Sequence, residues 1–357
     1  MNLLRKIAKK AVKRSFPVFA PWVLYVIRKL TIIATSLLLL RPFGGRIWIT
    51  YDPKVKPDGM GAQVQRILAI YGLAKYLRFN FLNTGIESVA VHPLDPYQSP
   101  RELNEFVAQL NKTFELPSDE IPIDCTRFSV ESLTLSYLVL VTMKNILKRK
   151  NILIQCMEPY GIVDFIPSIY SRARDNLINW QKFVNSSGAN SGSDGVIAVH
   201  YRQGVGGLVV QKGEKYPREI SSDYFVEAIQ SQLHRITINK ISIYTDTPSK
   251  DLIFDIPENQ EQLWETNPMV DKRKMRVIAS DLSLFESTFP GVVQIHSGGN
   301  PLEAIAFMST ASLLIIGRSS LSYVAAILNR EGLVIYPPNF WHSPLKNWKL
   351  GTLDSIA

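Results

Sequence analysis

Short runs of apolar, β-branched and aromatic residues alternate along the chain with stretches whose apolar residues recur at helical spacing. Residues 313–316 form a wholly apolar run, which is typical of a strand buried on both faces of a sheet. Residues 46–51 are rich in β-branched and aromatic side chains, which favour a strand. Strands that alternate with helices imply parallel sheets, so the predicted fold class is α/β.

The same reasoning assigns the other regular elements. Strands are predicted at residues 46–51, 88–91, 152–156, 196–199, 241–244, 292–295, 313–316 and 333–336. Helices are predicted at residues 63–76, 100–114, 131–148, 165–184, 222–234, 301–308 and 321–328.

A break in the pattern separates two α/β regions. Residues 185–194 are nearly all Ser, Gly, Asn and Asp and contain almost nothing to bury, as in a linker. The chain of 357 residues has room for about two domains of roughly 150 residues each. We predict an N-terminal domain at residues 46–184 and a C-terminal domain at residues 195–357, which face each other across a cleft.

Residues 1–45 carry a different pattern and are predicted to form a basic and apolar helical segment. Six Lys and Arg residues between positions 5 and 14 precede two apolar stretches, residues 16–27 and 30–40. Each stretch is shorter than the about 20 residues that span a bilayer, and the Arg28-Lys29 pair between them makes a joint span costly. Three alternatives follow: a helix in the membrane interface, a signal-anchor span, or a helix packed on the body of the protein.

Composition narrows the functional classes. The apolar fraction of 46% is sufficient for real cores. The two cysteines, Cys125 and Cys156, exclude a disulfide framework and a Cys-rich zinc site, and suit a reducing compartment. The net charge of +9 raises the alternative of nucleic-acid binding. No recognition motif accompanies that charge, and the basic excess is partly N-terminal, so no nucleic-acid partner is predicted.

Residues 298–328 give the strongest indication of a ligand-binding site in the sequence. Pro301 suits the first turn of a helix, residues 313–316 follow as a buried strand, and a turn with Ser319 and Ser320 then leads into the helix at 321–328. A helix N-terminus with free N–H groups, a favourable dipole and adjacent hydroxyls binds anions. A sugar-nucleotide diphosphate fits that description, although a Ser-Ser pair in this position also serves as an ordinary helix cap.

A second segment points to the same chemistry. The strand at residues 196–199 ends in His200-Tyr-Arg202-Gln-Gly204. At the carboxyl end of a sheet strand, His200 and Arg202 can enter the ligand crevice of an open α/β sheet. Arginine is the natural bidentate partner of a phosphate group.

Together with two further segments, these residues resemble the fucosyltransferase superfamily that includes α1,2-, α1,6- and protein O-fucosyltransferases. The matching segments lie in the family's order within residues 46–342. They are Asp58-Gly59-Met-Gly61-Ala-Gln63, His200-Tyr-Arg202-Gln-Gly204, Ile241-Ser-Ile-Tyr-Thr-Asp246, and Met308-Ser309 followed by Ser319-Ser320-Leu-Ser322 and Ala325-Ala326.

The resemblance implies a GT-B architecture of two Rossmann-like domains, with the acceptor on the N-terminal one and the donor on the C-terminal one. It implies transfer of fucose from GDP-fucose to a glycan by a metal-independent inverting mechanism, as in polysaccharide biosynthesis. The chain departs from the family pattern at Ala62, Val205 and Arg318. Two alternatives therefore stay open: a catalytically inactive sugar-nucleotide or glycan binder, and a transferase for another nucleotide sugar.

The predicted catalytic residue is Arg202, which would stabilise the leaving diphosphate. The predicted donor-binding residues are His200, Arg202, Asp246, Ser319, Ser320, Gly59, Gly61 and Gln63. For some of them a plainer role is also open: a strand-end histidine satisfied by a neighbour, an Asx-turn at the aspartate, and an ordinary turn at the two glycines.

No metal or other cofactor is predicted, because the chain contains no Asp-x-Asp pair. The general base is not identified by the sequence, where Asp58, Glu303, His296 and His342 are the acidic residues and histidines considered. Residues 1–40 are predicted to attach the protein to a membrane surface, with the catalytic domains on the cytoplasmic side.

Overall fold

The computed structural model describes most of the chain beyond the first 39 residues. The described residues are 40–52, 58–90, 95–97, 99–146, 150–189, 195–202, 208–211, 214–217, 220–246, 252–255, 274–277 and 282–351. Residues 1–39, on which nearly all of the membrane prediction depends, lie outside this set, as do linker residues 190–194. Within the described part, no helix combines the length and the apolar character needed to cross a bilayer.

The N-terminal half is built on a parallel sheet with the strand order β2-β1-β4-β3. Its strands are β1 (Ile47–Tyr51), β2 (Asn80–Phe81), β3 (Thr126–Ser132) and β4 (Ile152–Glu158). The two central strands, β1 and β4, are almost wholly buried, whereas the edge strand β3 alternates between half-buried and exposed residues. Apolar content therefore follows position in the sheet.

Among the described residues, six α-helices accompany this sheet. They are α3 (Met60–Leu77), α4 (Pro100–Thr113), α5 (Leu135–Ile146), α6 (Tyr160–Val163), α7 (Ile169–Arg174) and α8 (Trp180–Ser186). The longest of them, α3, buries 15 of its 18 residues, because it packs against β1, α7 and α13 of the C-terminal half. By contrast α4 is amphipathic and begins at a capping box, in which Ser99 and Glu102 satisfy each other's backbone N–H groups.

The C-terminal half contains a six-stranded parallel sheet with the order β11-β8-β5-β12-β13-β14. Its strands are β5 (Val196–Tyr201), β8 (Lys240–Thr245), β11 (Val293–Ser297), β12 (Leu313–Ile315), β13 (Leu333–Tyr336) and β14 (Lys349–Leu350). When these six strands are numbered along the chain, their order in the sheet is 3-2-1-4-5-6, as in a doubly wound sheet. The strand order, though not the strand direction, reverses between β5 and β12.

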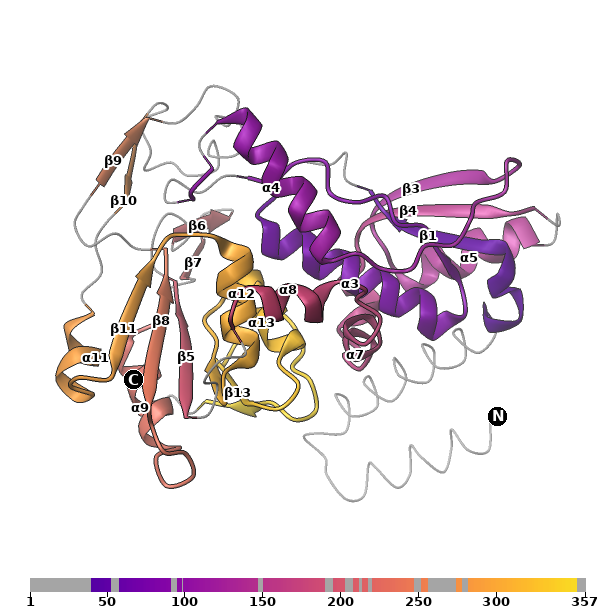
Figure 1. Ribbon diagram of the computed structural model, residues 1–357. Coiled ribbons are helices and arrows are strands. Elements are labelled where there is room, and N and C mark those ends of the chain that lie inside the picture. Colours follow the sequence, from indigo (N-terminus) through magenta and orange to yellow (C-terminus); the bar gives the residue numbers. More distant parts are fainter. Residues whose placement is uncertain are drawn as a thin grey trace, which may run out of the picture.

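In the described part of this half, four helices and two hairpins accompany the sheet. The helices are α9 (Ser222–Gln230), α11 (Ser283–Thr288), α12 (Pro301–Thr310) and α13 (Ser320–Leu328). The hairpins pair β6 (Leu208–Gln211) with β7 (Glu214–Pro217), and β9 (Leu252–Asp255) with β10 (Lys274–Val277). Figure 1 shows the two parallel sheets at opposite ends of the molecule, with α3, α7, α8, α12 and α13 between them.

One apolar core joins the two halves. Buried residues of β1 and α3 belong to the same packed cluster as those of α12 and α13, for example Tyr71 and Val324. A second cluster lies beneath α9 and α11, around Phe225 and Phe285. The predicted α/β class with parallel sheets is confirmed.

Several predicted elements were wrong in position or extent. Residues 88–90 form no strand. Their backbone groups form hydrogen bonds with the Asp58 loop and the start of α3 instead: the Ala90 N–H donates to the Asp58 carbonyl, and the Ser88 carbonyl accepts from the Gln63 side chain. Residues 131–132 belong to β3 and not to a helix, and the predicted helices at 165–184 and 222–234 are shorter or divided.

Candidate functional site

The point where the C-terminal sheet reverses its order brings two predicted segments together. Arg202 follows directly after β5, and Ser319 follows the neighbouring strand β12 as the N-cap of α13. In open α/β sheets, ligands bind in the crevice outside the carboxyl ends of the strands at such a reversal. The sequence-predicted residues thus lie where the topology favours a ligand.

Gly317 allows the two strand ends to approach. A Cβ atom at this position would lie 2.6 Å from the carbonyl oxygen of His200, which is closer than any side chain tolerates. Only glycine fits this contact without moving the backbone. The close approach holds the β5 and β12 ends, and with them Arg202 and Ser319, in fixed register.

The Arg202 guanidinium is held from two sides. Its Nη1 donates a hydrogen bond to Ser319 Oγ over 3.1 Å, and its Nε forms an ion pair with Asp246 Oδ2 at 3.4 Å. Asp246 follows β8, the other neighbour of β5. The Arg202 side chain is 25% exposed and that of Asp246 is 17% exposed. Arg202 is therefore oriented by protein groups while part of its surface still faces solvent.

The N-terminus of α13 adds a second positive element. Ser319 is buried, and its Oγ accepts from the backbone N–H of Leu321 over 3.3 Å. Ser320 is the first residue of the helix, and the first turn contains no acidic residue. The remaining free N–H groups and the helix dipole favour an anion beside Arg202. Ser319 thus acts as a helix cap and also as the hydroxyl that orients Arg202.

His200 lies within this arrangement as a neutral side chain. It is buried, and its Nδ1 atom has no hydrogen-bond partner among the described residues. Burial, with the Arg202 charge as a second cause, lowers the pKa of His200 to about 4. A neutral imidazole adds no charge to the site but leaves one polar atom to be satisfied.

We expect His200 to make folding stability sensitive to acid. Its pKa is lower in the folded protein than the about 6.5 of a free histidine, so the unfolded chain binds the proton more strongly. Stability should therefore fall as the pH drops from about 6.5 towards 4, by on the order of 2–3 kcal/mol in total. Urea unfolding at several pH values measures this slope, and His200→Gln should flatten it; an unchanged slope would refute the assignment.

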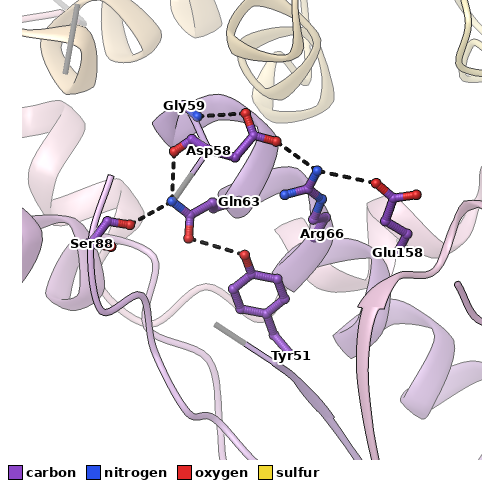
Figure 2. Close-up of polar contacts among 7 residues, drawn as sticks. All are labelled: Tyr51, Asp58, Gly59, Gln63, Arg66, Ser88 and Glu158. Carbon is purple, nitrogen blue, oxygen red and sulfur yellow. Dashed lines mark hydrogen bonds and ion pairs between the residues drawn. The ribbon is translucent and has the colours of Figure 1, made fainter. Parts of the chain in front are cut away.

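In the N-terminal half, Gln63 braces the loop that precedes α3 (Figure 2). Its Nε2 donates to the carbonyl oxygens of Asp58 and Ser88 over 2.8 and 2.7 Å, and its Oε1 accepts from the Tyr51 hydroxyl over 3.1 Å. The side chains of Gln63 and Tyr51 are both buried. In the described structure, Gln63 therefore fixes the shape of the Asp58 loop.

The Asp58 carboxylate is itself fixed by two groups (Figure 2). One oxygen accepts from the Gly59 N–H over 2.8 Å, and the other pairs with Arg66 Nη2 at 2.7 Å. The same Arg66 nitrogen lies 3.6 Å from Glu158 Oε1, at the carboxyl end of β4. Arg66 and Glu158 were absent from the predicted site, although Glu158 ends one central strand of the sheet and Asp58 lies in the loop after the other.

The Asp58 loop borders the α13 N-terminus across the two halves. A Cβ atom on Gly61 would lie 2.5 Å from the backbone nitrogen of Leu321 and 2.9 Å from the carbonyl carbon of Ser320. Gly61 thus allows α3 to touch the start of α13, while Gly59 faces open space. The structure connects Arg202, Asp246 and Ser319 directly, and places Gly61 against Ser320.

Metal ligands do not gather in the part of the chain that the structure describes, where no three His, Cys, Asp or Glu side chains lie close enough to share an ion.

Comparison with known proteins gives only remote likenesses. No family model matches the chain, and no curated protein matches it. The similar solved structures include POFUT1 in complex with GDP-fucose, at 10% identity and a TM-score of 0.46, covering 81% of this chain and 97% of that one. They also include a mutant of Arabidopsis thaliana FUT1 in complex with GDP, at 11% identity and a TM-score of 0.36, covering 85% and 72%.

A third similar structure is the E. coli heptosyltransferase WaaC with ADP-2-deoxy-2-fluoro heptose, at 11% identity and a TM-score of 0.32, covering 85% of this chain and 92% of that one. At such TM-scores these likenesses assign neither a family nor an activity to the chain.

Proposed function

We propose that this protein is a glycosyltransferase that moves fucose from GDP-fucose to a glycan acceptor, with inversion and without a metal ion. The observation that carries the proposal is the contact between Arg202 and Ser319 at the reversal point of the sheet. A forked cation, a helix N-terminus and a neutral histidine there form a site for an anion of diphosphate size.

The proposed chemistry requires stabilisation of a leaving group. When the bond from the sugar to the diphosphate breaks, negative charge grows on the diphosphate oxygens. Arg202, oriented in advance by Ser319 and Asp246, meets that charge without further reorganisation. The free N–H groups of α13 point at the same place. These two elements take the role that a divalent metal has in many other transferases.

The choice of GDP-fucose rests on the sequence resemblance to fucosyltransferases. Asp246 is the proposed acceptor for the N–H groups on the edge of a guanine base, and Ser320 and Gly59 are proposed to approach the donor from opposite halves. The test is release of GDP from GDP-fucose in the presence of a panel of oligosaccharides. Transfer from GDP-mannose or a UDP-sugar instead would refute GDP-fucose as the donor, while the reaction would still be glycosyl transfer.

We expect turnover to be independent of divalent metal. Arg202 and the α13 N-terminus supply the positive charge at the leaving group in this proposal. Turnover measured with and without EDTA should therefore agree within about twofold, because no electrostatic contribution is removed. Strict dependence on manganese or magnesium would overturn the proposed mechanism.

We also propose that residues 1–40 hold the protein on the cytoplasmic face of a membrane. Six cationic residues near an anionic surface contribute on the order of 1 kcal/mol each. Full-length protein should therefore sediment with anionic vesicles at low salt and less so at high salt, whereas residues 41–357 should stay in the supernatant. Full-length protein that never sediments would refute the attachment, and resistance to salt and alkaline wash would indicate a true span.

A further inference from the structure

A histidine–aspartate pair lies outside the donor site, between the two halves of the molecule. His342, in the segment between β13 and β14, has its Nδ1 atom 3.5 Å from Oδ1 of Asp164. Asp164 is the C-cap of α6, which follows the central strand β4 of the other sheet. The pair therefore joins chain segments that follow the carboxyl ends of strands in both sheets.

The two nitrogens of His342 differ in their surroundings. Nδ1 is wholly buried against Asp164, and His342 as a whole is 7% exposed. The remaining exposed surface therefore lies elsewhere on the residue, and no described side chain bonds to Nε2. A carboxylate that faces one ring nitrogen fixes the orientation of the ring and supports a positive charge on it. The other nitrogen is then available to accept a proton.

The pair is close to the proposed diphosphate site. The ring of His342 lies 5.2 Å from the ring of Tyr323, which is in the first turn of α13, three residues after Ser320. Three residues of helix rise about 4.5 Å. The same segment is tied to the end of β12 by a hydrogen bond from Arg318 Nη2 to the Pro338 carbonyl, over 3.2 Å. His342 thus packs against a residue that lies about one helical turn along from the start of α13.

Two exposed aromatic side chains flank the pair. Phe165, next to Asp164, is 43% exposed, and Trp341, next to His342, is 42% exposed. Large aromatic faces are costly to leave in water, and flat apolar faces of this kind stack on the C–H faces of sugar rings. An acceptor glycan is expected to pack on these faces, because they are exposed aromatic side chains next to the pair in the chain.

We propose that His342 is the general base of the reaction and that Asp164 is its positioning residue. This inference rests on the function proposed above. Nε2 of His342 takes the proton of the acceptor hydroxyl while that oxygen forms a bond to the anomeric carbon of the donor. The bond from that carbon to the diphosphate oxygen breaks, and its electron pair leaves with the diphosphate. His342 then returns the proton to water.

The two tyrosines that contact the His342 ring keep their protonation state. Tyr160 on α6 lies 4.5 Å from its ring and Tyr323 on α13 lies 5.2 Å away. Burial raises the pKa of both tyrosines, so both stay neutral. Arg66 on α3 acts on Tyr160 as a fixed positive charge. Asp164 is the carboxylate that faces the ring, and His200 belongs to the separate donor site with a pKa lowered to about 4.

The experiment compares His342→Gln, Asp164→Asn and the native protein by GDP release from GDP-fucose with the oligosaccharide panel. A positioned general base contributes typically 10²–10⁴-fold, so His342→Gln should lower kcat by about 100-fold or more. KM for GDP-fucose and the thermal shift with GDP should change little, since the donor contacts remain. Asp164→Asn should lower kcat less and Asp164→Glu should recover part of it. His234→Gln, a surface histidine, serves as the control.

The pH profile separates this role from a structural one. Native kcat should fall on acidification, because a protonated imidazole accepts no proton, and in His342→Gln this acid limb should disappear. Near-native kcat in His342→Gln would overturn the general-base role of His342 but would leave the proposed transferase function standing. Absence of GDP release by the native protein would overturn both. If His342→Gln does not fold, a native kcat that does not fall on acidification would overturn the inference.

Discussion

Replacement of Arg202 by lysine should lower turnover of the donor by about 100-fold or more, the scale on which removal of one preorganised donor acts. Lysine keeps the positive charge but loses the planar fork. It therefore loses the arrangement in which one nitrogen bonds to Ser319 and another pairs with Asp246 while the remaining donors face the ligand. The loss should appear mainly in kcat, because the charge on the diphosphate grows during bond breaking.

Arg330→Lys provides a matched control. Arg330 is a surface residue that pairs with Asp175 at 3.1 Å, away from the donor site. An exposed ion pair of this kind contributes about 0–1 kcal/mol to stability. Arg330→Lys should keep native turnover. Near-native activity in Arg202→Lys would show that the fork has no phosphate role.

Replacement of Gly61 by alanine should destabilise the fold by roughly 1–3 kcal/mol or more, the cost of an added methyl in a filled core. The new Cβ atom would lie 2.5 Å from the backbone nitrogen of Leu321. Backbone cannot rotate aside as a flexible side chain can, so α3 or the start of α13 must move. The shift would displace Ser320 and weaken donor binding together with stability.

Gly59→Ala is the control for this stability effect, because a Cβ atom there meets nothing within 4 Å and its φ of −58° suits any residue. Thermal unfolding of the two variants should differ by several degrees, at ~2–4 °C per kcal/mol for a protein of more than about 150 residues. Equal melting temperatures would mean that α3 and α13 do not make the contact described.

The sequence predicted best those elements that are buried on all sides. β12 is apolar throughout, and β5 and α13 are mostly apolar and buried, so their local pattern reveals them without knowledge of their neighbours. β3 was missed because it lies at a sheet edge and its side chains are half-buried or exposed. Two-residue strands such as β2 depend on pairing with β1, which a linear pattern does not encode.

The donor site was predictable in part for a similar reason. Arg202 and Ser319 each follow a recognisable strand, and the carboxyl ends of strands in one parallel sheet lie at the same edge. Their mutual hydrogen bond depends on the adjacency of β5 and β12, which only the folded topology supplies. The packing partner of Gly61 lies 260 residues further along the chain, at Leu321, and no local signal identifies it.

The most direct test is a thermal-shift series with GDP, UDP, GDP-fucose and GDP-mannose on the native protein and on Arg202→Lys. A ligand that binds only the folded state raises its apparent stability, by about 2.7 kcal/mol at 100 times its Kd. GDP and GDP-fucose should raise the melting temperature of the native protein, without added metal, and much less that of Arg202→Lys. No shift with any of the four, or equal shifts in both proteins, would contradict a nucleotide-sugar site at Arg202.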